Sequence, residues 1–164
     1  MFGKSIRQIV LVGALLGLGV DLPHGAEAVA PDENKLTSDI VQLHKNAERL
    51  YFQFKSKEAA AELQKILQAD GRNFDALIKL ARAYIDIGDR IAESGSNWQE
   101  RKLKEYRAAE EYARKALKLD ANSTWSHFWV AAAVGSVAGV APVAKQVELS
   151  AAIRDAVEKS LALD

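Results

Sequence analysis

Cysteine and histidine, two residue types that often carry chemistry, are scarce in this chain of 164 residues. There is no cysteine, so thiolate nucleophiles, disulfides and cysteine-based zinc sites are excluded. The histidines are His24, His44 and His127, and they form no tight cluster of the three or four ligands that a structural metal site needs. His127 is flanked by aromatic residues, and we predict that it packs among them. We expect the protein to bind neither a metal nor a cofactor.

Two pairs of carboxylates could act as general acid and base if the members of a pair met in a cleft. They are Glu110 with Glu111, and Asp86 with Asp89. All four fall on predicted helices, where a solvated helix face accounts for them without catalysis. The sequence has no Ser-His-Asp arrangement, phosphate-binding loop or glycine-rich dinucleotide motif. We therefore predict that the chain is not an enzyme.

The charges of the chain balance, because 22 basic residues face 22 acidic ones. A protein that binds nucleic acid needs a basic surplus to neutralise phosphates, so we expect no nucleic-acid partner. Hydrophobic residues make up 49% of the sequence, which is enough for a packed core and argues against an acidic disordered chain. The composition favours a small interaction domain.

The N-terminus has the pattern of a targeting signal. A short positive segment precedes the apolar residues 9–20, a run too short to span a bilayer. Ala26 and Ala28 are the small residues that signal peptidase accepts. We predict a cleavable signal peptide over residues 1–28 and a periplasmic or secreted bacterial protein, without stable membrane insertion after cleavage. An uncleaved anchor remains the alternative, because Asp21 follows the apolar run directly; a lipoprotein is excluded, since no cysteine is available for acylation.

The elements that must position any site are helices. After a polar, turn-like leader at residues 29–39, apolar residues recur at intervals of three and four, which predicts an all-α fold. The spacing predicts three helical hairpins in series over residues 40–164, with a loop at residues 135–141 inside the last one. Residues 121–144 have no charged side chain. A membrane helix and a buried helix with a covered loop could both explain this segment, and its polar residues favour the second.

The last helix is predicted to have a polar outer face that ends the array, with an apolar face towards the core. The residues assigned to that apolar face are Leu149, Ile153, Ala156, Val157 and Leu161.

The middle hairpin resembles the tetratricopeptide repeat (TPR) family. The residues at the spacing of the family's first helix are Leu77, Leu80, Ala81, Tyr84, Gly88 and Asp89. Ala109, Ala116 and residues 117–120 continue the pattern of the second helix. This resemblance covers most of residues 40–164 and implies an α-solenoid of about three TPR-like helical hairpins. Small residues at Ala81 and Ala109 would let two helices approach closely.

Long insertions in the second and third hairpins, together with Asn122, His127, Phe128 and Trp129, look like the repeat region of the regulator of microtubule dynamics proteins and their bacterial relatives. The microtubule association of the eukaryotic members is not carried over to an exported chain. A weaker similarity is to the TPR-type T-components of TRAP transporters, which are exported and bind ligand-handling partners.

The insertion at residues 90–104 leaves two questions open. Asn97 with Glu100, or Ser96 with Gln99, could form a capping box that starts a long helix. Trp98 could contact a partner or pin the insertion to the hairpin.

The TPR resemblance implies that the first helix of each hairpin lines a concave face that binds a peptide or a helix. Apolar anchors beside a few orienting charges suit such a groove, although aromatic residues on repeat helices can also simply pack. The predicted groove residues are His44, Glu48, Tyr51, Phe52, Ile78, Arg82, Ile85, Asp86, Trp125 and Phe128. The chain is thus expected to be an exported TPR scaffold for a protein or peptide partner, without catalysis. The alternative is a T-component-like, ligand-binding accessory subunit of a transport system, and homo-oligomerisation stays open.

Overall fold

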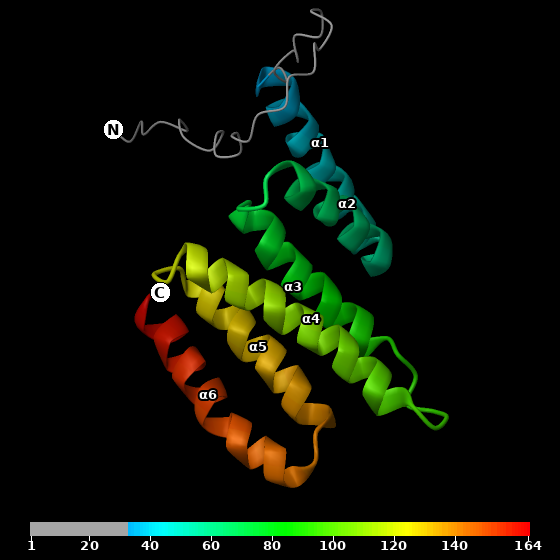
Figure 1. Cartoon of the computed structure of the whole chain (residues 1–164), viewed down its shortest axis with the longest axis vertical. Helices are drawn as coiled ribbons and strands as arrows, with labels where there is room; N and C mark the ends of the chain where they lie inside the picture. The colour runs from blue at the N-terminus through cyan, green and yellow to red at the C-terminus, as the bar shows by residue number, and fades with distance from the viewer. Residues whose placement is uncertain (1–32) are drawn as a thin grey trace, which may run out of the picture. The chain divides into compact units, whose positions relative to one another are not determined.

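The computed structural model describes residues 33–164, and in this part of the chain six helices follow one another as three hairpins (Figure 1). Each helix packs on its neighbours in sequence, and α3 also contacts α5. The all-α prediction of about three TPR-like hairpins is confirmed. The predicted signal peptide, with Ala26 and Ala28, lies outside the described residues. The helices are α1 (Glu33–Phe52), α2 (Ser56–Ala69), α3 (Phe74–Asp89), α4 (Trp98–Leu119), α5 (Thr124–Val140) and α6 (Val143–Ala162).

Small residues allow the close contact between α3 and α4. Ala81 and Ala109 are both completely buried, as the TPR spacing predicts. At Gly88, an added Cβ would lie less than 3.0 Å from atoms of the Tyr106 ring. The Tyr106 hydroxyl donates a hydrogen bond to Asp89 at 2.7 Å, which holds that ring against the glycine. Gly88 is therefore required by the approach of two helices.

Two hydrophobic clusters fill the array. The first joins α1, α2 and α3 and includes Leu63, Ile66 and Leu80. The second joins α3 and α4 to α5 and α6 and includes Ala81 and Val134. Because α3 contributes to both clusters, it is packed on two sides, which makes it a firm support for side chains that project from it.

The turn between α1 and α2 is a Schellman motif. The amide of Lys55 bonds the Leu50 carbonyl at 3.0 Å, and the amide of Phe54 bonds the Tyr51 carbonyl at 2.9 Å. Phe54 has a φ of 61°, the left-handed conformation that glycine usually supplies at this position. A side chain with a Cβ costs about 1–2 kcal/mol in that conformation.

The insertion after α3 forms a short connection at residues 90–97 and then lengthens α4. Asn97 immediately precedes this helix, but its side chain makes no capping hydrogen bond. The Lys102 ammonium is largely buried and pairs with Glu93 at 2.6 Å, and it also lies 5.8 Å from the centre of the Trp98 ring. All three residues lie within the insertion, so these contacts hold the insertion together, and the role of Trp98 stays open.

The predicted loop at residues 135–141 is wrong, because α5 continues to Val140. Gly135 and Gly139 lie inside this helix, and a Cβ at either would meet no atom within 4 Å. The helix ends where Pro142 cannot continue it. Likewise, residues 33–38 of the predicted turn-like leader already belong to α1. The glycine, serine and valine residues at the end of α5 are weak helix formers, so the buried contacts of Val137 and Ala138, and not intrinsic propensity, keep that segment helical.

The predicted core face of α6 is only partly correct. Leu149, Ile153 and Ala156 pack on the second cluster. Val157 and Leu161 do not, since they are 41% and 72% exposed. With 3.6 residues per turn, these two positions lie beyond the face that points to α5. Val143 and Val147 are exposed as well, so the outer face of α6 mixes apolar with polar side chains.

No helix within residues 33–164 combines the length and the apolar character needed to cross a membrane.

Candidate functional site

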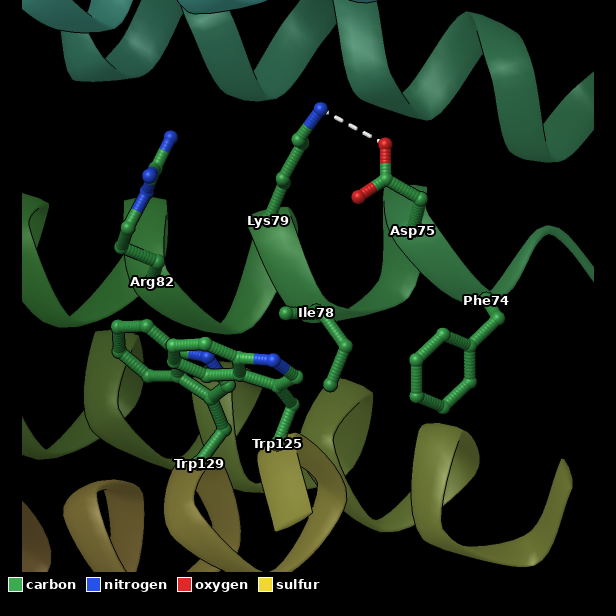
Figure 2. A pocket seen from close by; sticks show the side chains of 7 residues that line it. All are labelled: Phe74, Asp75, Ile78, Lys79, Arg82, Trp125 and Trp129. Carbon is green, nitrogen blue, oxygen red and sulfur yellow. Dashed lines mark ion pairs between the residues drawn. The ribbon is translucent and has the colours of Figure 1, made fainter. Parts of the chain in front are cut away.

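A cavity of about 230 Å³ lies between α3 and α5, and we call it the α3–α5 hollow. Figure 2 shows Trp125 and Trp129 rising from α5 towards α3, where Ile78 and Phe74 complete an apolar wall. Lys79 extends from α3 on the side away from the tryptophans. The hollow is lined by Phe74, Asp75, Ile78, Lys79, Arg82, Trp125 and Trp129.

The spacing of the lining residues explains why they meet. Phe74, Ile78 and Arg82 follow one another at intervals of four residues along α3, so they lie on one face of the helix. Trp125 and Trp129 have the same relation on α5. Trp125 is 60% exposed, which leaves most of its ring available to a partner.

A network of charged side chains joins this hollow to α1. Lys79 pairs with Asp75 at 2.7 Å and with Glu48 at 3.3 Å. The Arg82 guanidinium bonds both oxygens of Glu48 at 3.2 and 3.3 Å, and it stacks over the Tyr51 ring at 3.9 Å. These partners hold the cations in fixed positions, while the Nε of Arg82 is buried without a hydrogen-bond partner.

His44 stands at the edge of the network. Its Nδ1 lies 3.3 Å from an oxygen of Asp75, but the two atoms are not aligned as a hydrogen bond. The network therefore carries charges of both signs, and it can orient a polar partner without attracting one net charge.

The structure brings six of the ten predicted groove residues together. Ile78, Arg82 and Trp125 line the hollow itself. His44, Glu48 and Tyr51 contact its charged residues. Four further lining residues lie at helical spacing from predicted groove residues but were not among them: Phe74, Asp75, Lys79 and Trp129.

The other four predicted groove residues lie elsewhere. Phe52 is 73% exposed at the end of α1, and Ile85 does not line the hollow. Phe128 packs edge-to-face against Trp125 and Trp129, with ring centres 6.0 and 5.0 Å apart, and it lines a larger hollow of about 570 Å³ beside α6. Asp86 accepts hydrogen bonds from the side chains of Arg90 and Ser56 and so ties α3 to α2.

Groups with a shifted pKa lie outside the hollow. Hydrogen bonds from Arg90 lower the pKa of Asp86, and the same contact raises the pKa of Arg90. Burial raises the pKa of Tyr84, and the nearby Tyr112 adds to this effect. Burial, together with the bond to Asp89, raises the pKa of Tyr106. All of these contacts hold helices in place, so the shifts have structural causes.

The remaining candidate residues for chemistry are engaged separately. Glu110 pairs with Arg114 at 2.7 Å, and Glu111 pairs with Lys115 at 2.6 Å. The Nε2 of His127 donates to the Ala121 carbonyl at 2.9 Å. Across residues 33–164, no three histidine, aspartate or glutamate side chains gather as metal ligands.

Comparison with known proteins gives one family. The family model described as "Regulator of microtubule dynamics protein 1-3" matches residues 43–164, which include all seven residues that line the hollow and its charged network. No curated protein matches the chain.

Proposed function

The chain belongs to the regulator of microtubule dynamics protein 1-3 family, and from this premise we propose that its TPR-like array is a scaffold that binds a segment of a protein partner at the α3–α5 hollow. The observation that supports this proposal most is the exposed ring of Trp125 beside Trp129 and Ile78, in a hollow with an ordered charged rim. Exposed aromatic anchors of this kind supply most of the free energy in protein recognition.

The size of the hollow favours a protein side chain over a whole small molecule. Its volume of about 230 Å³ is below the range of roughly 300–1,000 Å³ in which ligand pockets usually fall. One large apolar side chain of a partner would fill it, while neighbouring polar groups of that partner met Lys79 and Asp75. At this hollow, a T-component-like role in ligand binding is therefore the weaker candidate.

The test is selection of peptides from a random displayed library against the whole chain, followed by affinity measurement with Trp125→Ala. We expect this variant to bind the selected peptides about 30-fold more weakly, the loss typical of a central anchor. Phe52→Ala is the matched control, because it removes an even more exposed aromatic ring that lies outside the hollow. Equal binding to the wild type and Trp125→Ala would contradict the proposal, and stabilisation by small molecules without peptide binding would favour the alternative.

Arg82→Glu is a poor test of the same proposal. It would place a second carboxylate against Glu48 and leave Tyr51 without its stacking partner. We expect this variant to lose stability, so a loss of binding could not be assigned to the hollow.

We further propose that the protein is exported, on the basis of its positive, apolar and Ala-x-Ala N-terminal pattern. Cleavage after Ala28 would make Val29 the first residue of the mature protein. Mass spectrometry of the N-terminal peptide from cells tests this directly: we expect Val29, and a chain that keeps residues 1–28 would favour the anchor.

A further inference from the structure

The chain turns between α1 and α2 (Figure 1), and we call residues 52–57 the α1–α2 tip. This tip exposes two aromatic rings. Phe52 and Phe54 are each 73% exposed, although phenylalanine side chains are usually buried. They are neighbours on a convex turn, not isolated surface residues. Adjacent exposed rings of this kind mark a surface that contacts something apolar.

The left-handed backbone conformation of Phe54 indicates that the turn itself does not require an aromatic side chain at this position. The Schellman hydrogen bonds require a left-handed residue at this position, and glycine would adopt it without strain. A phenylalanine keeps the same turn at a cost in stability. Strained residues persist mainly where the strained group has a function.

The charges around the tip are mainly positive. Arg49, Lys55 and Lys57 are exposed, and within residues 33–164 none of them lies in an ion pair. Glu58 is the nearest exposed acid in sequence, so a local positive excess remains. Arg90 reaches the tip from the end of α3 and lies 5.1 Å from the centre of the Phe54 ring, but its own charge is paired with Asp86, so the positive excess rests on Arg49, Lys55 and Lys57.

We propose that the α1–α2 tip docks on an anionic lipid surface, where Phe52 and Phe54 enter the interface and Lys55, Lys57 and Arg49 meet the lipid phosphates. The surface of a bilayer accepts apolar rings that project from a convex turn and attracts the cations beside them. This contact is separate from the α3–α5 hollow, so the scaffold can hold a partner while its tip rests on the membrane.

The test uses the absence of cysteine in the whole chain. A polarity-sensitive fluorophore is attached to Gln53→Cys in the tip or to Gln68→Cys at the far end of α2. Both glutamines are exposed, and α2 separates them by about 20 Å. The probe is a vesicle of phosphatidylserine and phosphatidylcholine in equal parts, compared with phosphatidylcholine alone. We expect a blue shift at position 53 with the anionic vesicles and none at position 68.

Variants of the tip separate lipid binding from folding. Phe54→Gly should keep or raise the melting temperature, because it relieves the strained turn, and should weaken vesicle binding at least tenfold, since the ring is lost. Replacing both Lys55 and Lys57 by Ala should weaken it about 25-fold, because each cation near an anionic surface contributes about a fivefold effect.

Three results would overturn the proposal. One is an unchanged signal at position 53 with anionic vesicles. Another is an equal shift at position 68, which would mean that another part of the chain adsorbs to the lipid. The third is a shift at position 53 with polyglutamate but not with vesicles, which would assign the tip to an acidic protein.

Discussion

The ring of Tyr106 on α4 packs directly against Gly88 of α3. The tyrosine ring is 4% exposed, and its hydroxyl is held by Asp89, so it cannot turn aside for an added atom. A glycine at this place in a helix would otherwise lower stability, since alanine is the better helix former. The glycine at this position of the TPR pattern is therefore required by the packing of α4 on α3.

Gly88→Ala should destabilise the protein by about 1–3 kcal/mol, the usual cost of overpacking a filled core. The measurement is urea unfolding followed by circular dichroism. In a Tyr106→Leu background the alanine should cost much less, because the ring it meets is gone. If Gly88→Ala left the stability of the otherwise unchanged protein intact, the close approach would be contradicted.

Because of Asp86, the free energy of unfolding should decrease at acidic pH. Its pKa is below the ordinary value of 3.8 because Arg90 and Ser56 donate hydrogen bonds to the ionised form. The ionised form is thus favoured by folding, so its contribution is complete above pH 3.8 and is lost as the pH falls through the lower, folded pKa.

Comparison of the free energy of unfolding at about pH 7 and about pH 3 tests this. Asp86→Asn should be less stable than the wild type near neutrality and should lose less on acidification. Asp155→Asn, on the exposed side of α6, controls for the removal of one carboxylate. If acidification lowered the free energy of unfolding of Asp86→Asn as much as that of the wild type, this role of Asp86 would be contradicted.

At the scale of elements, α5 contains two glycines that the packing does not require. A Cβ at Gly135 or Gly139 would meet nothing within 4 Å. Each glycine leaves backbone freedom in the unfolded chain that alanine would remove.

Gly135→Ala and Gly139→Ala should therefore each raise the free energy of unfolding by about 0.5–1 kcal/mol, the opposite sign to Gly88→Ala. Thermal and urea unfolding of the single variants provide the measurement. A decrease for either one would mean that the end of α5 packs more closely than the structure has it.

These glycines also show what could be predicted from the sequence. Apolar spacing was sufficient for the hairpins, because a helix that packs on neighbours keeps a period of 3.6 residues. Within α5 nearly every residue is apolar or small, so no period distinguishes a helix from a loop, and the glycines suggested the loop. Only the tertiary contacts of α5 decide the matter.

The residues of the candidate site, like the helices, could be predicted only in part from the sequence. Aromatic and charged residues on the first helices of the hairpins identified Ile78, Arg82 and Trp125. Phe52 was assigned to the groove because it lies on α1, but the helix ends at that residue. Lys79 and Asp75 were not assigned, although each lies three residues from a predicted groove residue on the same helix. What the sequence does not show is that Glu48 of another helix pairs with Lys79.

At the scale of the whole array, the hollow lies on α3, which is anchored by both hydrophobic clusters. Tyr112 packs against both clusters too and stacks on Tyr84, with ring centres 5.5 Å apart. A wall supported on two sides does not have to order itself when a partner arrives, which lowers the entropic cost of binding. This arrangement is consistent with a scaffold whose binding face is formed before the partner is present.

The most direct measurement is photo-crosslinking in cells that make the whole protein, with a photoreactive amino acid in place of Ile78 in the hollow. The control carries it in place of Ala61, an exposed residue of α2. We predict an adduct with a polypeptide at position 78, none at position 61, and loss of the adduct when Trp125→Ala is introduced into the same chain. A chain with no polypeptide adduct at position 78, or with equal adducts at both positions, would contradict a peptide-binding hollow between α3 and α5.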